Sequence, residues 1–202
     1  MMKIIERYRT RISQALGLVY ILVFALSEKK LETTAPTVTG IMIIAGCVLV
    51  GIGIVGRLWC AQYIAGYKTD SLITGGPYSV CRNPLYFFSF IGGTGVALCT
   101  ESITLALILP ALFAVIYPVT IFQEEKNLLA AHGETYRRYM YSVPRFIPKW
   151  SLFHEPPEYM VRTKIFRREA IDAVYFASAV GLFEMIEELI NFGIIRTFFV
   201  LY

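Results

Sequence analysis

The chain has 202 residues, of which 56% are hydrophobic and 17% are charged, and its formal net charge is +4. Soluble domains average about 45–50% apolar and about 25% charged residues, so this composition argues against an ordinary soluble domain. It also argues against nucleic-acid binding, because the basic residues form no patch interleaved with exposed stacking aromatics.

The apolar residues fall into runs long enough to cross a bilayer, for which a helix needs about 20 residues. We expect four spans, at about residues 12–27, 39–60, 85–100 and 103–122. The first run could instead be a signal-peptide core, although no small-residue cleavage site follows it. Only Glu101 and Ser102 separate the last two runs, which predicts a tight antiparallel hairpin. Pro110 and Pro118 predict kinks in the fourth helix.

Lysine and arginine residues gather before the first run and after the fourth, and the turn at Glu101 has none. By the positive-inside rule, this distribution predicts a multi-pass integral membrane protein with a cytoplasmic N-terminus. The excess positive charge then indicates contact with anionic headgroups of the lipid bilayer.

We therefore expect an all-α fold: a polytopic membrane helical bundle of four to five spans with a cytoplasmic C-terminal segment that forms a pocket. Residues 1–150 would form the membrane core, including an interfacial cytoplasmic helix at 123–141. Residues 151–202 would be a C-terminal helical extension of unknown role.

Within that extension Glu184, Glu187 and Glu188 interrupt a largely apolar stretch. An acid at the centre of a bilayer costs about 2.5–3.5 kcal/mol. One or two helices lying against the membrane or the core are therefore our main expectation, and a fifth, partial span is the alternative.

Glycines are frequent in the second and third runs, where small residues allow helix backbones to approach closely. The alternative is that Gly51-Ile52-Gly53 or the glycines near Gly92 leave room for a ligand. The cysteines show no CxxC spacing, so we predict no metal site and treat them as small core residues. They are Cys47, Cys60, Cys81 and Cys99.

The stretch GPYSVCRNPLY, residues 76–86, is unusually rigid and polar for a connection between membrane helices. Its two prolines fix their own φ and favour extended geometry before them. Pro84 suits the first position of the third helix, and Asn83 then stands at the N-cap. In the simplest interpretation Arg82 lies at the membrane interface and the tyrosines belong to an aromatic belt.

Two adjacent acids, Glu124 and Glu125, lie at the cytoplasmic end of the fourth run. They could be a solvated helix start that is favoured by the helix dipole. A cationic ligand, such as a positively charged cofactor, would explain them better.

Two segments, LITGGPYSVCRNPLYFFSFIGGTGVAL and EEKNLLAAHGETYRRYMYSVPRFIP, carry an ordered set of motifs. These are G-P-Y, R-[HN]-P-x-Y, a double Glu, L-x(4)-G-E-x-Y-x-x-Y and V-x-R-x-x-P. In order and spacing, residues 72–148 resemble the isoprenylcysteine carboxyl methyltransferase and phospholipid methyltransferase group of integral membrane enzymes.

The resemblance implies S-adenosylmethionine-dependent methyl transfer to a lipid-like or prenylated acceptor, which could be a carboxylate, amine, hydroxyl or thiol. The cofactor would lie in a cytoplasm-facing pocket, and the hydrophobic acceptor would enter from the bilayer. Carried over by motif, the catalytic residues are Glu125 and Glu124. The cofactor-binding residues are Tyr78, Arg82, Asn83, Pro84, Tyr86, Leu128, Tyr136 and Tyr139.

The chain departs from the motif pattern in two places. Asn83 stands where many members have His, and it cannot titrate. The segment YPVTIFQEE lacks the Arg that precedes the glutamates in many prenylcysteine enzymes, so Arg145 or Arg82 would have to replace it. His132 is a second candidate base. Two other classes stay open: an NADPH-dependent membrane sterol-reductase-like enzyme and a non-catalytic membrane scaffold.

Overall fold

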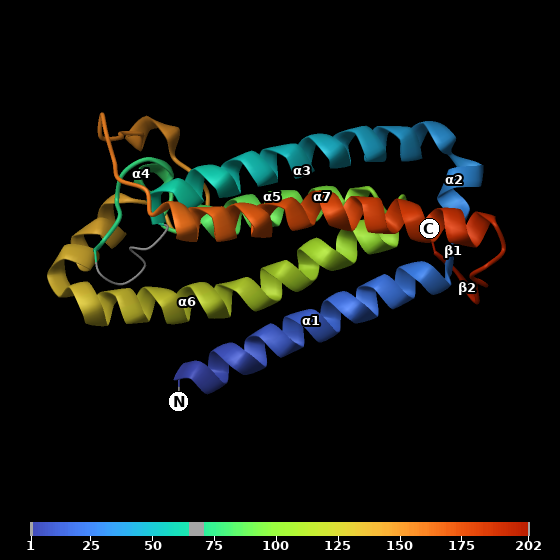
Figure 1. Ribbon diagram of the computed structural model, residues 1–202, viewed down its shortest axis with the longest axis horizontal. Coiled ribbons are helices and arrows are strands. Elements are labelled where there is room, and N and C mark those ends of the chain that lie inside the picture. The colour runs from blue at the N-terminus through green and yellow to red at the C-terminus, as the bar shows by residue number, and fades with distance from the viewer. Residues whose placement is uncertain (1, 65–70, 202) are drawn as a thin grey trace.

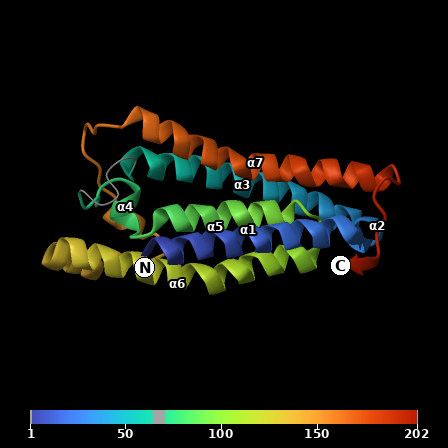
Figure 2. The same ribbon diagram turned by 60° about the horizontal axis from the view of Figure 1, so that its bottom comes forward.

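The computed structural model describes residues 2–64 and 71–201, and it is a bundle of long helices lying side by side (Figures 1 and 2). The helices are α1 (Met2–Leu26), α2 (Lys30–Thr34), α3 (Pro36–Ile64), α4 (Pro77–Val80), α5 (Pro84–Leu98), α6 (Ile103–Ser142), the 3-10 turn η1 (Trp150–Leu152) and α7 (Thr163–Asn191). Two short strands, β1 (Ser27–Lys29) and β2 (Phe199–Leu201), pair in parallel. The expectation of a mostly helical chain is confirmed, and the strand pair is an addition to it.

Two helices, α3 and α6, are long and apolar enough to cross a membrane, and the apolar parts of α1 and α5 are shorter. The fourth predicted span and the predicted cytoplasmic helix form one continuous element, α6. Its non-helical backbone angles are at Gly133 and not at the two prolines. A proline removes a hydrogen bond but its fixed φ suits a helix, whereas Gly133 has φ 54°, which favours glycine.

The predicted hairpin between α5 and α6 is present. The turn holds Glu101 at φ 56°, and the hydroxyl of Ser102 caps α6 by accepting from the backbone N–H of Leu105. The side chain of Glu101 is buried in this turn, where Lys29 contacts it.

Glycines bring α3 and α5 into backbone contact, as close packing requires. A methyl group built on Gly53 would lie 2.5 Å from the Cα of Gly92, and one on Gly95 would lie 2.6 Å from the carbonyl oxygen of Gly46. The space at Gly53 and Gly92 is therefore filled by the facing backbone, which supports the packing interpretation and not the ligand alternative. Gly51 has no atom within 4 Å of such a methyl group.

The C-terminal extension forms one helix, α7, which runs along the bundle beside α3 (Figures 1 and 2). Phe183 of α7 packs on Phe24 of α1, with ring centroids 4.7 Å apart, and Phe176 lies against Gly92 of α5. Beyond α7 the chain turns back, and β2 pairs with β1 at the end of α1. The helix therefore lies against the core of the bundle, as the main expectation has it, and α7 is not among the described helices that are long and apolar enough to cross a membrane.

Replacing Gly95 by alanine should destabilise the protein by about 1–3 kcal/mol, because the added methyl group must push α3 away from α5. Gly93→Ala is the matched control, since its methyl group meets nothing within 4 Å. Thermal unfolding of both variants in detergent checks this. Equal melting temperatures would contradict the packing described for α3 and α5.

The fifth-span alternative predicts that the two ends of α7 lie on opposite sides of the membrane. In a background with all four cysteines replaced by alanine, a cysteine at the exposed Phe192 should react with a membrane-impermeant maleimide on intact cells. A cysteine at the exposed Ser151, near the start of α7, should react only after permeabilisation. Labelling of both positions from one side would contradict a crossing helix.

Candidate functional site

The site lies at the end of the bundle where α3 and α6 end and α5 begins (Figure 1). The Asn–Pro corner, residues 76–84, is fixed there by backbone hydrogen bonds to the segment after α6. The N–H of Arg82 donates to the carbonyl of Pro144 at 2.9 Å, and the N–H of Lys149 donates to the carbonyl of Val80 at 2.9 Å. The corner and residues 143–154 therefore form one unit, while residues 65–70, just before it, lie outside the described residues.

The corner begins at Gly76, whose φ of 58° only glycine adopts readily. A methyl group at this position would lie 2.3 Å from the ring of Tyr63 at the end of α3. Pro84 stands near the first position of α5, as the sequence predicts, and Pro77 stands near the first position of the short helix α4, which the sequence analysis did not predict. These residues set where the polar side chains of the corner point.

Asn83 occupies the N-cap position of α5, but its side chain makes no capping hydrogen bond. Its Nδ2 instead donates to Glu125 Oε1 at 3.2 Å and to the carbonyl of Arg145 at 3.0 Å. The expected position is confirmed and the expected capping bond is wrong, because the amide is used to join α5 to α6.

Glu125 is the centre of the site and its side chain is only 4% exposed. Arg145 grips Oε2 through Nε at 3.0 Å and Nη2 at 2.9 Å. Nη1 of Arg82 lies 3.1 Å from Oε1, but without the alignment of a hydrogen bond. Two guanidinium groups and one amide thus surround one buried carboxylate.

Several buried donors at the site have no hydrogen-bond partner among the described residues. They include Nε and Nη1 of Arg82 and the hydroxyl of Tyr78. A buried donor without a partner is costly, typically about 1–3 kcal/mol. Such donors mark positions where the oxygen atoms of a ligand would be bound.

Glu124, the neighbour of Glu125, faces a different partner. Its Oε1 accepts a hydrogen bond from the hydroxyl of Tyr86 at 2.7 Å. Tyr86 lies one helical turn along α5 from Asn83, so the two glutamates contact successive turns of the same helix.

Two tyrosines of α6 that were predicted to bind the cofactor, Tyr136 and Tyr139, lie close to the Asn–Pro corner. The hydroxyl of Tyr139 donates to the carbonyl of Tyr78 at 2.6 Å. Tyr136 is almost fully buried and packs with Tyr139, Val143 and Leu128. The site residues predicted from the sequence therefore lie close together in the structure. Pro84 and Leu128 are among them, but their side chains are apolar and make no hydrogen bond.

Two other residues were treated less fully in the sequence reasoning. Arg145 entered only as a spatial substitute, yet it makes the closest ion pair to Glu125; the V-x-R-x-x-P motif is the signal that marks it. Nε2 of His132 is buried without a partner among the described residues.

Burial raises the pKa of the Cys81 thiol to about 11, so this thiol stays neutral near pH 7 beside the carbonyl of Phe146.

Comparison with known proteins gives a match to the model of the phospholipid methyltransferase family over residues 37–135. A cobalt-zinc-cadmium resistance protein, CzcN, of Cupriavidus metallidurans is 35% identical over 159 residues, which are 79% of this chain and 73% of that protein. The chain belongs to the phospholipid methyltransferase family.

A second similar protein is the nickel-cobalt-cadmium resistance protein NccN of Alcaligenes xylosoxydans xylosoxydans. It is 42% identical over 139 residues, which are 69% of this chain and 65% of that protein, so the match spans just under two thirds of its length. No solved structure matches the chain. The family match includes Asn83, Glu124 and Glu125 and ends before Tyr136 and Arg145.

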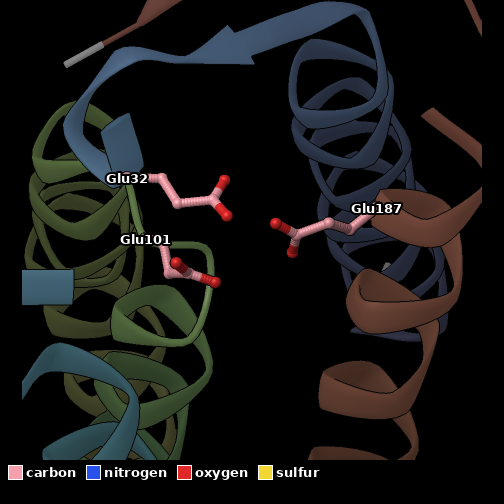
Figure 3. Close-up of side chains that lie close together, drawn as sticks. All are labelled: Glu32, Glu101 and Glu187. Atoms are coloured by element: carbon pink, nitrogen blue, oxygen red, sulfur yellow. The ribbon is translucent and has the colours of Figure 1, made fainter. Parts of the chain in front are cut away.

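A second polar cluster lies at the other end of the bundle, where β1 and α2 lie near the end of α7 (Figure 1), and Figure 3 shows its side chains. Glu32, Glu101 and Glu187 come from three elements and offer carboxylate oxygens within 4.8 Å of one another. Lys29 contacts two of them: its Nζ lies 3.4 Å from Glu101 and also pairs with Glu187. The cluster therefore already contains a cation of the chain itself, and it ties α7 to the turn between α5 and α6.

The charge of Glu101 should make the stability of the protein depend on pH. Burial raises the pKa of this carboxyl, and the nearby Lys29 only partly opposes the effect. An acid whose pKa is raised by folding contributes stability below its unfolded pKa of about 4.3, and that stability is lost as pH rises through the folded value.

Glu101→Gln removes this titration, so its melting temperature relative to the wild type should rise between pH 5 and pH 8. Glu32→Gln is the control, because Glu32 is an exposed member of the same cluster. Thermal unfolding across that pH range provides the measurement. A difference between Glu101→Gln and wild type that stays constant with pH would contradict the assignment.

Proposed function

We propose that the chain transfers the methyl group of S-adenosylmethionine to a lipid-like or prenylated acceptor at the cytoplasmic face of the membrane. The observation that carries the proposal is the contact between the Asn–Pro corner and Glu125. Had these elements faced different directions, no shared site could form. The family membership supports methyl transfer as the reaction class.

The residues present fit the proposed cofactor. Its carboxylate would be held by Arg82, whose Nε is buried without a hydrogen-bond partner among the described residues and whose Nη1 pairs with Glu125 without a hydrogen bond. Its positive charge would be stabilised by the carboxylates of Glu124 and Glu125. The buried hydroxyl of Tyr78 offers a further donor. When bound, S-adenosylmethionine supplies an electrophilic methyl group on a sulfonium.

The chain's own contribution is positioning and exclusion of water. Asn83 and Arg145 fix Glu125 at the end of the bundle, and the buried tyrosines close the site from the α6 side. Holding two reactants in line within a water-poor site supplies most of the catalysis expected for a displacement at a methyl carbon.

The relatives' names refer to resistance to metals. In the described part of this chain, the candidate metal ligands are the three acids of Figure 3. Lys29 already pairs with two of those acids. The donor set around Glu125, rich in arginine, favours an anionic ligand group over a metal cation.

S-adenosylhomocysteine should raise the melting temperature of the purified protein in detergent, because a ligand that binds only the folded state stabilises it. Asn83→Ala removes the amide that joins Glu125 to the corner, so we expect about tenfold weaker binding, which corresponds to loss of one hydrogen bond to a charged group. Asn127→Ala, at an exposed amide on α6, should bind as the wild type does.

The same thermal measurement separates the alternatives. Stabilisation by NADPH instead would indicate the reductase-like enzyme, and stabilisation by neither ligand would indicate a scaffold. Unchanged affinity of Asn83→Ala together with a lower melting temperature would reduce Asn83 to a structural role.

A further inference from the structure

The two adjacent glutamates differ in how their charge is compensated. Successive residues of a helix point about 100° apart, so Glu124 and Glu125 cannot share one set of partners. Both oxygens of Glu125 are occupied, Oε1 by the Asn83 amide and Oε2 by Arg145, with Arg82 beside them. Both oxygens of Glu125 thus face donors of the chain itself, so this carboxylate serves to hold the Asn–Pro corner and Arg145 in place.

Glu124 has fewer partners. The hydroxyl of Tyr86, a neutral group, donates to its Oε1, and no ion pair joins Glu124 to a basic side chain in the described part of the chain. It is also partly exposed, whereas Glu125 is buried. Oε2 of Glu124 is therefore the oxygen of the pair that can take up a proton.

Aromatic side chains lead to Glu124 from within the bundle. The ring of Tyr86 packs edge-on against Tyr117 at 5.1 Å, Tyr117 stacks on Phe113, and Phe113 packs against Phe90 at 5.4 Å. These four side chains come from α5 and α6, and each is partly exposed. An apolar molecule that arrives along them would present its polar end to Glu124.

We propose that Glu124 is the residue that accepts the proton of the methyl acceptor, and that Glu125 is a positioning residue that acts through Arg82, Arg145 and Asn83. The acceptor is then a lipid-like amine, thiol or hydroxyl compound and not a carboxylate, which has no proton to lose and which Glu124 would repel. This inference rests on the proposed methyl transfer.

The atoms balance as follows. The nitrogen, sulfur or oxygen of the acceptor forms a bond to the methyl carbon while the carbon–sulfonium bond breaks, and its electron pair stays on sulfur. The acceptor's proton goes to Oε2 of Glu124. The products are the methylated acceptor, a neutral thioether and a protonated Glu124, which returns the proton to water.

The test uses the full-length protein in detergent with radiolabelled S-adenosylmethionine and a total membrane lipid extract. Glu124→Gln should lower methyl transfer at least about 100-fold, which is the usual contribution of a general base. It should leave most of the melting-temperature shift caused by S-adenosylhomocysteine in place, because this ligand lacks the sulfonium charge that Glu124 would stabilise. Glu124→Asp should restore part of the activity, and the acidic limb of the wild-type pH–rate profile should be absent from the residual rate of Glu124→Gln.

Glu125→Gln should lose both the transfer and the S-adenosylhomocysteine shift, while Glu134→Gln, an exposed acid of the same helix, should keep both. The labelled wild-type product should survive alkali, as amines, thioethers and ethers do. Release of labelled methanol by alkali would show a carboxylate acceptor and overturn this inference while leaving methyl transfer intact. Wild-type rates in Glu124→Gln would also overturn it. If the wild type labels no lipid, the proposed function fails and this inference fails with it.

Discussion

A buried carboxylate organises the end of the bundle at which α3 and α6 end and α5 begins. Removing a charged group from water costs several kcal/mol, and only close partners offset that cost. Glu125 gains them from three segments that are distant in sequence: Arg82 and Asn83 before α5, and Arg145 after α6. The Asn–Pro corner and the segment after α6 must therefore both pack against α6 to stabilise the buried charge of Glu125. Because Glu125 is already shared with Asn83 and Arg145, Nε and Nη1 of Arg82 make no hydrogen bond within the part of the chain that the structure describes, although Nη1 pairs with Glu125.

The glycine contacts between α3 and α5 determine where that end of the bundle lies. Because Gly53 and Gly92 meet backbone to backbone, α5 has little freedom to slide along α3. The contact continues toward the site through Gly56, which packs on the ring of Phe88, and ends with Tyr63 against Gly76. Rigid packing within the bundle thus carries through to the start of the Asn–Pro corner, and a methyl group added at these glycines should displace the corner as well as the helices.

The sequence predicted what depends on composition and local backbone preference. The apolar runs, the tight turn at Glu101, the glycine packing and the cap position of Asn83 all follow from such local rules. These local rules did not predict which side chains pair across the bundle. The amide of Asn83 bonds across to α6 because Glu125, a residue 42 positions away, needs a donor. The pairing of Arg145 with Glu125 and of β1 with β2 likewise depends on contacts between distant segments, which no local pattern records.

The course of α7 shows what a local rule can and cannot predict. Three glutamates near its end argued against a fifth span and for a helix against the membrane or the core, because a central acid in lipid is expensive, but they did not predict which partner they would meet. In the structure these acids occupy the last turns of α7, which ends at Asn191, close to β1 and the turn between α5 and α6. There Glu187 meets Lys29, so the charge is paired at the end of the bundle and not at its middle. The penalty depends on depth and partner as well as on residue type, and both are set by how far along its neighbours α7 extends.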